Sequence, residues 1–323
     1  MTVRLSGDLA NPISINGPPV NLNFNPGQNA KLTFEGTAGQ WVSVGLSDMT
    51  LGVGFCCEVG TISMLKPDGS VLLAPMNFNN AGAGTASAQL PVSGTYAIVI
   101  DPWFARSGAM TVTLSEDLSP PISINGTAAN LNYRIGQNAR MTFAGTGGQW
   151  VSVGLSDMTL GVGFCCEVGT ISMLKPDGTV LQAGMNFNNA GAGTASAQLP
   201  ASGTYAIVID PWFERSGAMT VTLSEDLSPP ISINGSPANL NYRIGQNARI
   251  TFEGTAGQRV SVGLSDMTLG VGFCCEVGTI SMLKPDGTVL LSPMNFNNSG
   301  AGTTSQDLPV SGTYAIVIDP WFA

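Results

Sequence analysis

Histidine is absent from this chain of 323 residues, and charged residues make up only 10% of it. Without histidine the chain lacks the commonest general base and the commonest zinc ligand, and it cannot build a Ser-His-Asp or Cys-His nucleophile pair. The sequence also contains no phosphate-binding loop and no cluster with metal-ligand spacing. These absences predict that the protein is not an enzyme.

Basic residues are also scarce. The chain has 12 Lys and Arg against 21 Asp and Glu, a net charge of −9, and no basic cluster. This charge balance excludes nucleic acid and anionic membrane surfaces as expected partners. No apolar run approaches the roughly 18 residues of a membrane span, so none is expected. Frequent Gly and Pro with few helix-forming residues are typical of an all-β protein.

One long unit is written three times. Residues 42–69 recur letter for letter at 151–178 and at 260–287, with a spacing of 109 residues. A unit of that length is a whole small domain rather than one turn of a solenoid. The predicted division is an N-terminal orphan strand at 1–9, then domains at 10–118, 119–227 and 228–323, the last without its final strand.

The middle unit shows the pattern of half-buried strands. Apolar and polar residues alternate over 141–143, 151–156 and 219–224, which is the period of a strand with one covered face. Residues 205–209 are apolar throughout, as in a central strand covered on both sides. Turn sequences such as Asn125-Gly126 separate these runs. We therefore predict three tandem antiparallel β-sandwiches of the jelly-roll or immunoglobulin-like type. The Ser-Pro-Pro linkers predict a semi-rigid rod.

Several phrases recur in the same order in the units. In the middle unit they are GQNAR (136–140), GQWVSV (148–153), LKPDG (174–178), LPASGTY (199–205) and GAMTVTL (217–223). This set resembles the bacterial pre-peptidase C-terminal (PPC) β-sandwich and related repeats of large secreted bacterial proteins, over nearly the whole chain. The resemblance implies non-catalytic modules that space, attach or assemble other parts, outside the cell or at its surface. A chain with only such modules departs from the pre-peptidase context.

The cysteines occur as the adjacent pairs Cys56-Cys57, Cys165-Cys166 and Cys274-Cys275. Adjacent side chains of a strand point to opposite faces, so both sulfurs cannot enter one core. Each pair could close its own disulfide ring in the GVGFCC loop, one cysteine could bond a neighbouring domain or chain, or the pair could stay reduced. The expected extracellular setting favours oxidation, with the ring slightly ahead. Zinc is not expected at such spacing.

Two further residue groups have competing interpretations. An aromatic motif follows the central strand of each unit, at Trp103, Phe104, Trp212, Phe213, Trp321 and Phe322. We interpret these as contact aromatics at domain ends, with a sugar-stacking platform as the alternative. Carboxylates that calcium could use are Asp48, Glu58, Asp68, Asp101, Glu116 and Asp117. They match no calcium loop, so turn and strand-end roles are favoured. No cofactor is expected, with calcium as the minority alternative.

The two ends of the chain are out of phase with its repeat. Residues 1–6 match 110–115 and 219–224, the last strand of a unit, and the third unit stops before its own copy. We expect Met1, Val3 and Leu5 to enter the incomplete third domain of another copy, giving a head-to-tail extracellular filament. The alternatives are an adhesin-like array that binds surface polysaccharide, and a stretch of a longer repeat protein in which the same junction is covalent.

The cysteine hypothesis has a direct test. Without reduction, the peptide that contains Cys56 and Cys57 is expected to be two hydrogen atoms lighter than its reduced form in mass spectrometry, because a ring within the pair removes both thiol protons. The reduced sample is the control. Peptides cross-linked through a single cysteine would support a bond between domains or chains, and free thiols would contradict oxidation.

Overall fold

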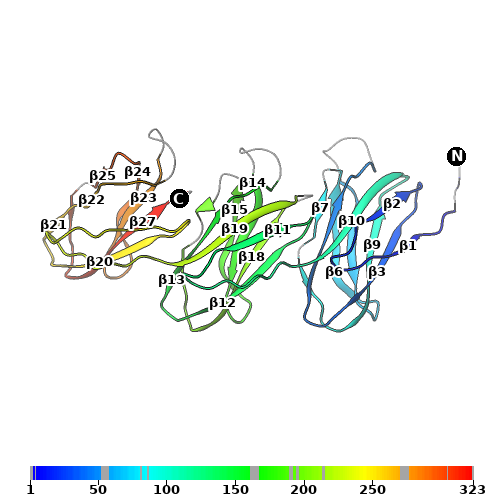
Figure 1. Ribbon diagram of the computed structural model, residues 1–323, viewed down its shortest axis with the longest axis horizontal. Coiled ribbons are helices and arrows are strands. Elements are labelled where there is room, and N and C mark those ends of the chain that lie inside the picture. Colours follow the sequence, from blue (N-terminus) through cyan, green and yellow to red (C-terminus); the bar gives the residue numbers. More distant parts are fainter. Residues whose placement is uncertain are drawn as a thin grey trace.

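A computed structural model describes residues 3, 5–51, 58–80, 82–85, 87–160, 167–188, 192–193, 196–212, 215–269, 276–303 and 305–321. These residues form strands and turns without a helix, in three groups that follow one another along the long axis (Figure 1). We call these groups repeat 1 (residues 10–118), repeat 2 (119–227) and repeat 3 (228–323). The expected all-β, antiparallel class is confirmed, whereas the domain boundaries stay predictions.

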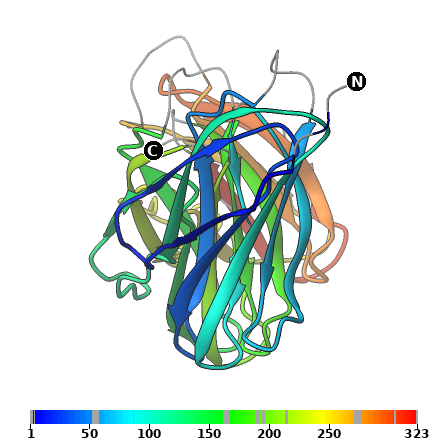
Figure 2. The same ribbon diagram turned by 90° about the vertical axis from the view of Figure 1, so that its right-hand side faces the viewer.

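Repeat 1 forms two sheets. Its strands are β1 (Leu9–Pro12), β2 (Val20–Phe24), β3 (Ala30–Gly36), β4 (Trp41–Ser47), β5 (Glu58–Leu65), β6 (Val71–Asn79), β7 (Ala83–Gly84), β8 (Ala88–Gln89), β9 (Gly94–Pro102) and β10 (Gly108–Glu116). One sheet has the order β1-β3-β9-β5-β6 and the other the order β2-β10-β4-β7, with β8 also paired to β4. Only β1 and β3 run parallel among these pairs. Figure 2 looks onto this repeat from its end of the chain.

Repeat 2 has the same arrangement. Its strands are β11 (Ala129–Tyr133), β12 (Ala139–Gly145), β13 (Trp150–Ser156), β14 (Glu167–Leu174), β15 (Val180–Asn188), β16 (Ala192–Gly193), β17 (Ala197–Gln198), β18 (Gly203–Pro211) and β19 (Gly217–Glu225). The sheets have the orders β12-β18-β14-β15 and β11-β19-β13-β16, with β17 paired to β13. A parallel bridge between Leu118 and Ala139 takes the place of the β1–β3 pair.

Repeat 3 keeps one sheet and lacks the other. Its strands are β20 (Ala248–Gly254), β21 (Arg259–Val260), β22 (Gly263–Leu264), β23 (Gly278–Leu283), β24 (Val289–Phe296), β25 (Ala301–Gly302), β26 (Gln306–Asp307) and β27 (Gly312–Pro320). The first sheet has the order β20-β27-β23-β24, as in repeat 2. In place of the second sheet, the described residues form only the two-stranded ladders β21-β26 and β22-β25.

The alternating strands bury one core in each repeat. The buried apolar side chains fall into three groups, and each group stays within one repeat. In repeat 1, Tyr96 is fully buried, its ring stacks on Phe34 with the centroids 5.4 Å apart, and its hydroxyl donates to the Val92 carbonyl at 2.5 Å. Tyr205 and Tyr314 repeat this arrangement.

The described ranges hold no helix of the length and hydrophobicity that a membrane crossing requires.

The second sheet of a complete repeat is centred on its last strand. β10 pairs with β2 on one side and with β4 on the other, and β19 pairs in the same way with β11 and β13. We call β10 and β19 the closing strands. Their inward residues fill the core: Met110, Val112 and Leu114 are each at most 1% exposed. A closing strand therefore completes a core and satisfies two sheet edges at once.

Identical sequences take different structures in repeats 2 and 3. ANLNY is strand β11 at 129–133, but the same five residues form no strand at 238–242. VSVGL lies within the continuous strand β13 at 151–155, but it is broken at 260–264. Because the local sequence is the same, the difference follows from the missing closing strand between the two segments. Local propensity for a strand depends strongly on such partners.

Hydrogen exchange is expected to report this difference. In the unassembled chain, the amides within 130–132 that bond to β19 should exchange at least about tenfold more slowly than the equivalent amides within 239–241, because β11 is paired with β19 whereas 238–242 form no strand. Residues 127–128 and 236–237 differ in sequence, so peptides from the two repeats can be told apart by mass. Equal protection in the two segments would contradict the open second sheet of repeat 3.

Candidate assembly site and the junctions between repeats

Repeat 3 exposes apolar side chains that repeats 1 and 2 bury. We call residues 238–242 and 260–264 the acceptor segments. Leu240, Val262 and Leu264 are half-buried there, whereas the equivalent Leu131, Val153 and Leu155 of repeat 2 are at most 2% exposed. These residues pack against the repeat 3 core from the side where a closing strand would lie. The acceptor segments thus combine partly exposed apolar side chains with unpaired strand edges, the two features that promote strand addition.

The segment that matches a closing strand lies at the opposite end of the molecule. Val3 is 82% exposed and Leu5 is 99% exposed. Figure 1 shows this end of the chain extending away from repeat 1, far from repeat 3. Met1, the third residue predicted for assembly, lies outside the described residues.

Consecutive repeats meet backbone to backbone at paired glycines. A side chain on Gly45 of β4 would overlap the carbonyl group of Ile135, and one on Gly136 would overlap Gly45. Gly154 and Gly245 form the same contact between repeats 2 and 3. Gly136 also has φ 66°, a left-handed conformation that side chains disfavour. Only glycine therefore permits so close an approach of the repeats.

Polar side chains of the following repeat bind the end of the preceding one. The Arg134 guanidinium donates to the carbonyl oxygens of Gly17 and Leu114, and Gln137 Nε2 donates to the Glu116 carbonyl at 2.7 Å. Arg243 and Gln246 make the equivalent bonds between repeats 2 and 3. Since both junctions use the same donors and acceptors, they have the same local geometry.

A cation stacks on an aromatic ring at both junctions. The guanidinium carbon of Arg140 lies 3.7 Å from the ring centroid of Trp41, and Arg249 lies 3.7 Å from that of Trp150. Contacts of this kind contribute about 0.5–2 kcal/mol, more where water is excluded. No local sequence pattern marks these four residues as a contact. Comparison of the repeats does offer a signal, because the residue equivalent to Trp41 and Trp150 in repeat 3 is Arg259.

The outer faces of repeat 1 and repeat 3 each have one glycine that is equivalent to a glycine of the junction contact. Gly263 is the equivalent of Gly45 and Gly154, and Gly27 is the equivalent of Gly136 and Gly245. A Cβ atom at either position would meet no atom within 4 Å. Gly27 has φ 72°, so it keeps the left-handed conformation of Gly136. Each outer face therefore keeps the glycine that its side of an internal junction uses.

Two carboxyl groups lie close together inside each junction. Burial, and after it the charge of Asp117, raises the pKa of Asp210 to about 6. Burial also raises the pKa of Asp117, although Ser87 Oγ donates a hydrogen bond to it at 2.6 Å. With its amide oriented to satisfy both neighbours, Asn138 donates to Asp210 Oδ1 at 3.0 Å and accepts from the Ser87 backbone N–H. In the second junction, burial and Asp226 raise the pKa of Asp319 to about 6.

The aromatic motif lies partly at the junctions. Trp212 of repeat 2 lines a cavity of about 430 Å3 together with Gly82, Ala83 and Gly84 of repeat 1. Trp103 and Trp321 are half-buried, and Phe104 is 83% exposed with φ 62°. Phe213 and Phe322 lie outside the described residues, as do all six cysteines.

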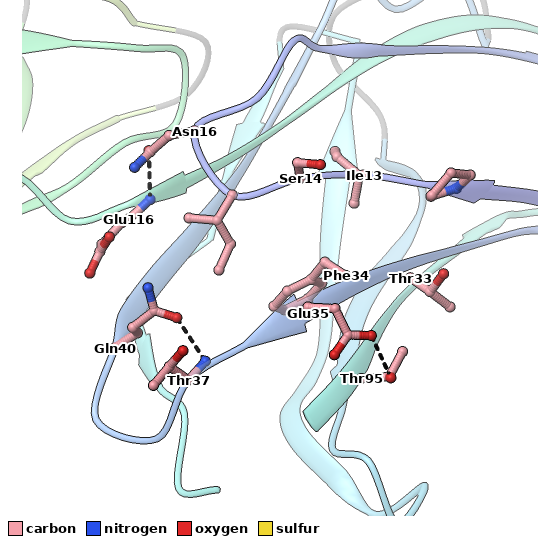
Figure 3. A pocket seen from close by; sticks show the side chains of 12 residues that line it. Ile13, Ser14, Asn16, Thr33, Phe34, Glu35, Thr37, Gln40, Thr95 and Glu116 are labelled. Carbon is pink, nitrogen blue, oxygen red and sulfur yellow. Dashed lines mark hydrogen bonds between the residues drawn. The ribbon is translucent and has the colours of Figure 1, made fainter. Parts of the chain in front are cut away.

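A second cavity, of about 530 Å3, lies in repeat 1 between residues 12–16 and β3 (Figure 3). Its polar groups already bond one another: Thr95 Oγ1 donates to Glu35 Oε1 at 2.6 Å, and the Thr37 backbone N–H donates to Gln40 Oε1 at 2.8 Å. Its aromatic residue, Phe34, is only 2% exposed and cannot serve as a stacking platform. This cavity therefore offers little to a sugar.

The described residues contain no group of three or more Asp, Glu, Cys or His side chains that could hold a metal ion. The carboxylates considered for calcium are separated: Asp48 has φ 51° next to β4, Asp68 accepts from Ser70 in a turn, and Glu58 accepts from Asn77. Among them, Asp117 and Glu58 lie at the first junction. These carboxylates thus occupy turn, strand-end and junction positions.

No family model and no curated protein matches this chain. Similar solved structures include the CUB1-EGF-CUB2 domains of human MASP-1/3, 9% identical with a TM-score of 0.21, covering 64% of this chain and 99% of that chain. Tripeptidyl peptidase 2 is 10% identical with a TM-score of 0.25, covering 96% of this chain and 27% of that one. Lac15 from a marine microbial metagenome is 11% identical, with a TM-score of 0.16 and coverages of 97% and 84%. Likenesses this distant carry no argument about function.

The raised pKa values predict junctions that weaken as pH rises. Asp210 and Asp319 have pKa values of about 6 in the folded chain against an ordinary 3.8, so between these values the folded state binds more protons and stability falls with pH. Replacing both residues with Asn should raise the melting temperature near pH 7.5 by several degrees, since roughly 4–8 °C corresponds to 1 kcal/mol in a domain of about 100 residues.

The matched control for this experiment is Asp101→Asn. Asp101 is the equivalent residue of repeat 1, and it is exposed. Its substitution should leave the melting temperature nearly unchanged. A double variant with the same pH dependence as the parent protein would contradict the assignment of Asp210 and Asp319.

Proposed function

We propose that this chain is a structural subunit of an extracellular filament in which copies join head to tail. Residues 1–6 of one copy form the closing strand of repeat 3 in the next copy, between its acceptor segments. The observation that carries the proposal is that ANLNY and VSVGL form paired strands in repeat 2 but not in repeat 3. A missing closing strand accounts for both differences at once.

The N-terminal segment fits this role by its sequence. Residues 1–3 repeat 110–112 letter for letter, and Leu5-Ser6 repeats 114–115. Met1, Val3 and Leu5 would take the inward positions that Met110, Val112 and Leu114 fill in β10. Burying three such side chains contributes roughly 5–9 kcal/mol, at about 1.5–3 kcal/mol each, before the cost of ordering the segment. Arg4, which replaces Thr113, is the one mismatch among the first six residues.

The outer faces support the same pairing of copies. Gly263 of one copy and Gly27 of the next can make the backbone contact that joins repeats 1 and 2 and repeats 2 and 3. The donated strand also leads directly into repeat 1, as β10 leads into repeat 2. A copy-to-copy junction would therefore continue the internal geometry along the filament. Contacts of this head-to-tail type do not close on themselves.

The proposal also covers a longer chain. If further repeats precede or follow these residues in the same polypeptide, the closing strand of repeat 3 is supplied covalently and the fibre is one chain. An extracellular location belongs to the proposal as well. It is supported by the adjacent cysteine pairs and by the resemblance to secreted repeat proteins.

A multivalent array that binds surface polysaccharide is the second candidate. It is favoured by the cavity at the first junction, where Trp212 lies beside Glu58, Asn77 and Asp210. An aromatic ring among a few convergent polar groups is a common arrangement for small ligands. A filament would present such cavities at regular intervals, which raises avidity for a repetitive ligand.

The filament proposal is tested by the substitution Gly263→Val. In a single copy the new side chain enters open space, so repeat 3 should fold as before. In a polymer it would overlap the backbone of the next copy, as a side chain on Gly45 would overlap Ile135. We expect the parent chain to form polymers in electron microscopy and light scattering, and the variant to remain monomeric.

A mixing experiment separates strand donation from general aggregation. A chain lacking residues 1–6 keeps the acceptor segments but has no strand to donate, whereas Gly263→Val keeps the strand but has a blocked face. Each should be monomeric alone, and an equimolar mixture should give a heterodimer by size-exclusion chromatography. Filaments that persist after deletion of residues 1–6 would rule the mechanism out.

A further inference from the structure

The copy-to-copy junction would differ from the internal junctions at one cluster of side chains. At both internal junctions an Arg of the following repeat stacks on a Trp of the preceding one, Arg140 on Trp41 and Arg249 on Trp150. At the outer faces both partners are replaced. Lys31 stands where Arg140 and Arg249 stand, and Arg259 stands where the two Trp residues stand. The stacked pair therefore cannot form between copies.

A third replacement adds an anion beside Arg259. Gln89 and Gln198 lie directly across the ladder from Trp41 and Trp150, and the residue in the same place opposite Arg259 is Asp307. The Arg259 Nε atom and the Asp307 Oδ1 atom are 4.0 Å apart, and both side chains are largely exposed. Residues directly opposite on antiparallel strands have Cβ atoms about 4.5–5.5 Å apart. Asp307 is thus within reach of a cation held over position 259.

We propose that Lys31 of one copy pairs with Asp307 of the preceding copy, so that the joint between copies is ionic where the internal joints are cation–π contacts. This inference rests on the proposed head-to-tail assembly. Lys31 enters the place of Arg140, above Arg259, and Asp307 bridges the two cations. Without Asp307, Lys31 and Arg259 would repel each other.

Other contacts of the internal junction are also weakened between copies. Arg134 and Arg243 bind two carbonyl groups of the preceding repeat, but their equivalent in repeat 1 is Asn25, which is too short to do so. The equivalent of Ile135 and Ile244 is Pro26. The ionic cluster therefore contributes a larger fraction of the stabilisation of the copy-to-copy joint than the stacked Arg–Trp pair contributes at an internal junction.

An ionic joint on an exposed face responds to salt. The Debye length falls from about 10 Å at 0.1 M salt to about 3 Å at 1 M, which screens exposed charge pairs and leaves packed contacts nearly unchanged. Filaments should consequently separate between copies as salt rises, while the two internal junctions of each copy stay intact. Ionic strength would then control filament length without unfolding the repeats.

The test measures mean filament length against salt for the parent chain and three variants. The parent should shorten several-fold between about 0.1 M and 1 M salt. Asp307→Lys should shorten the filaments even at low salt, and the charge exchange Lys31→Asp with Asp307→Lys should restore their length. The pair Lys31→Arg with Arg259→Trp rebuilds the internal contact and should give filaments that resist salt.

The control is Glu253→Lys, an equal change of charge on repeat 3 at a position where repeat 2 has Ala144. It should leave the salt response unchanged. If the parent polymerises but neither salt nor the charge variants alter its length, the ionic inference is wrong and the filament proposal stands. If the parent forms no polymer at any salt concentration, both are wrong.

Discussion

Each complete repeat is organised around a strand that hydrogen-bonds on both of its edges. β10 and β19 supply the middle of the second sheet, three inward side chains for the core and the direct link to the following repeat. A strand in the middle of a sheet satisfies backbone groups of two neighbours, so its absence exposes two edges rather than one. Repeat 3 shows the consequence. Its first sheet is intact, but of the two segments that should flank a closing strand, 260–264 is split between two short ladders and 238–242 forms no strand.

The junctions depend on backbone shape more than on side-chain packing. Gly45 and Gly136 let two main chains touch, and the guanidinium group of Arg134 binds carbonyl oxygens rather than another side chain. Two repeats joined in this way have little freedom to move relative to each other. A displacement would break the backbone contact and the hydrogen bonds to carbonyl oxygens together. Repetition of the same contact at Gly154 and Gly245 gives successive repeats the same relation to each other.

Much of the fold could be predicted from the sequence because the strands alternate so regularly. The expected strands at 141–143, 151–156 and 219–224 lie within β12, β13 and β19. The apolar run 205–209 is central in its sheet, as expected, but Ala206 and Val208 are only half-buried, since one face of that sheet is incompletely covered. The sequence also pointed to a missing strand in repeat 3, by counting repeats.

What sequence reasoning missed depends on contacts between repeats. The pairing of Gly45 with Gly136 joins residues 91 positions apart, and no local pattern marks it. The stacking of Arg140 on Trp41 was hidden because each residue is ordinary in its own strand. Only comparison of the three repeats at these positions, Trp41 with Arg259 and Arg140 with Lys31, distinguishes internal faces from outer ones. The carboxyl groups of Asp117 and Asp210 likewise come from different repeats.

The place of the closing strand in each repeat also affects how the chain is made. β2 and β4 leave the ribosome before β10 exists, so each new repeat stays open while about 5–20 residues are added per second, a delay of several seconds. β10 and β19 have the identical sequence GAMTVTLSE and fit either repeat equally well. Two factors therefore direct each closing strand to its own repeat. The first is the order in which the strands leave the ribosome, and the second is the lower entropy cost of closing the shorter loop within one repeat. Synthesis from one end thus sorts strands that their sequences cannot distinguish.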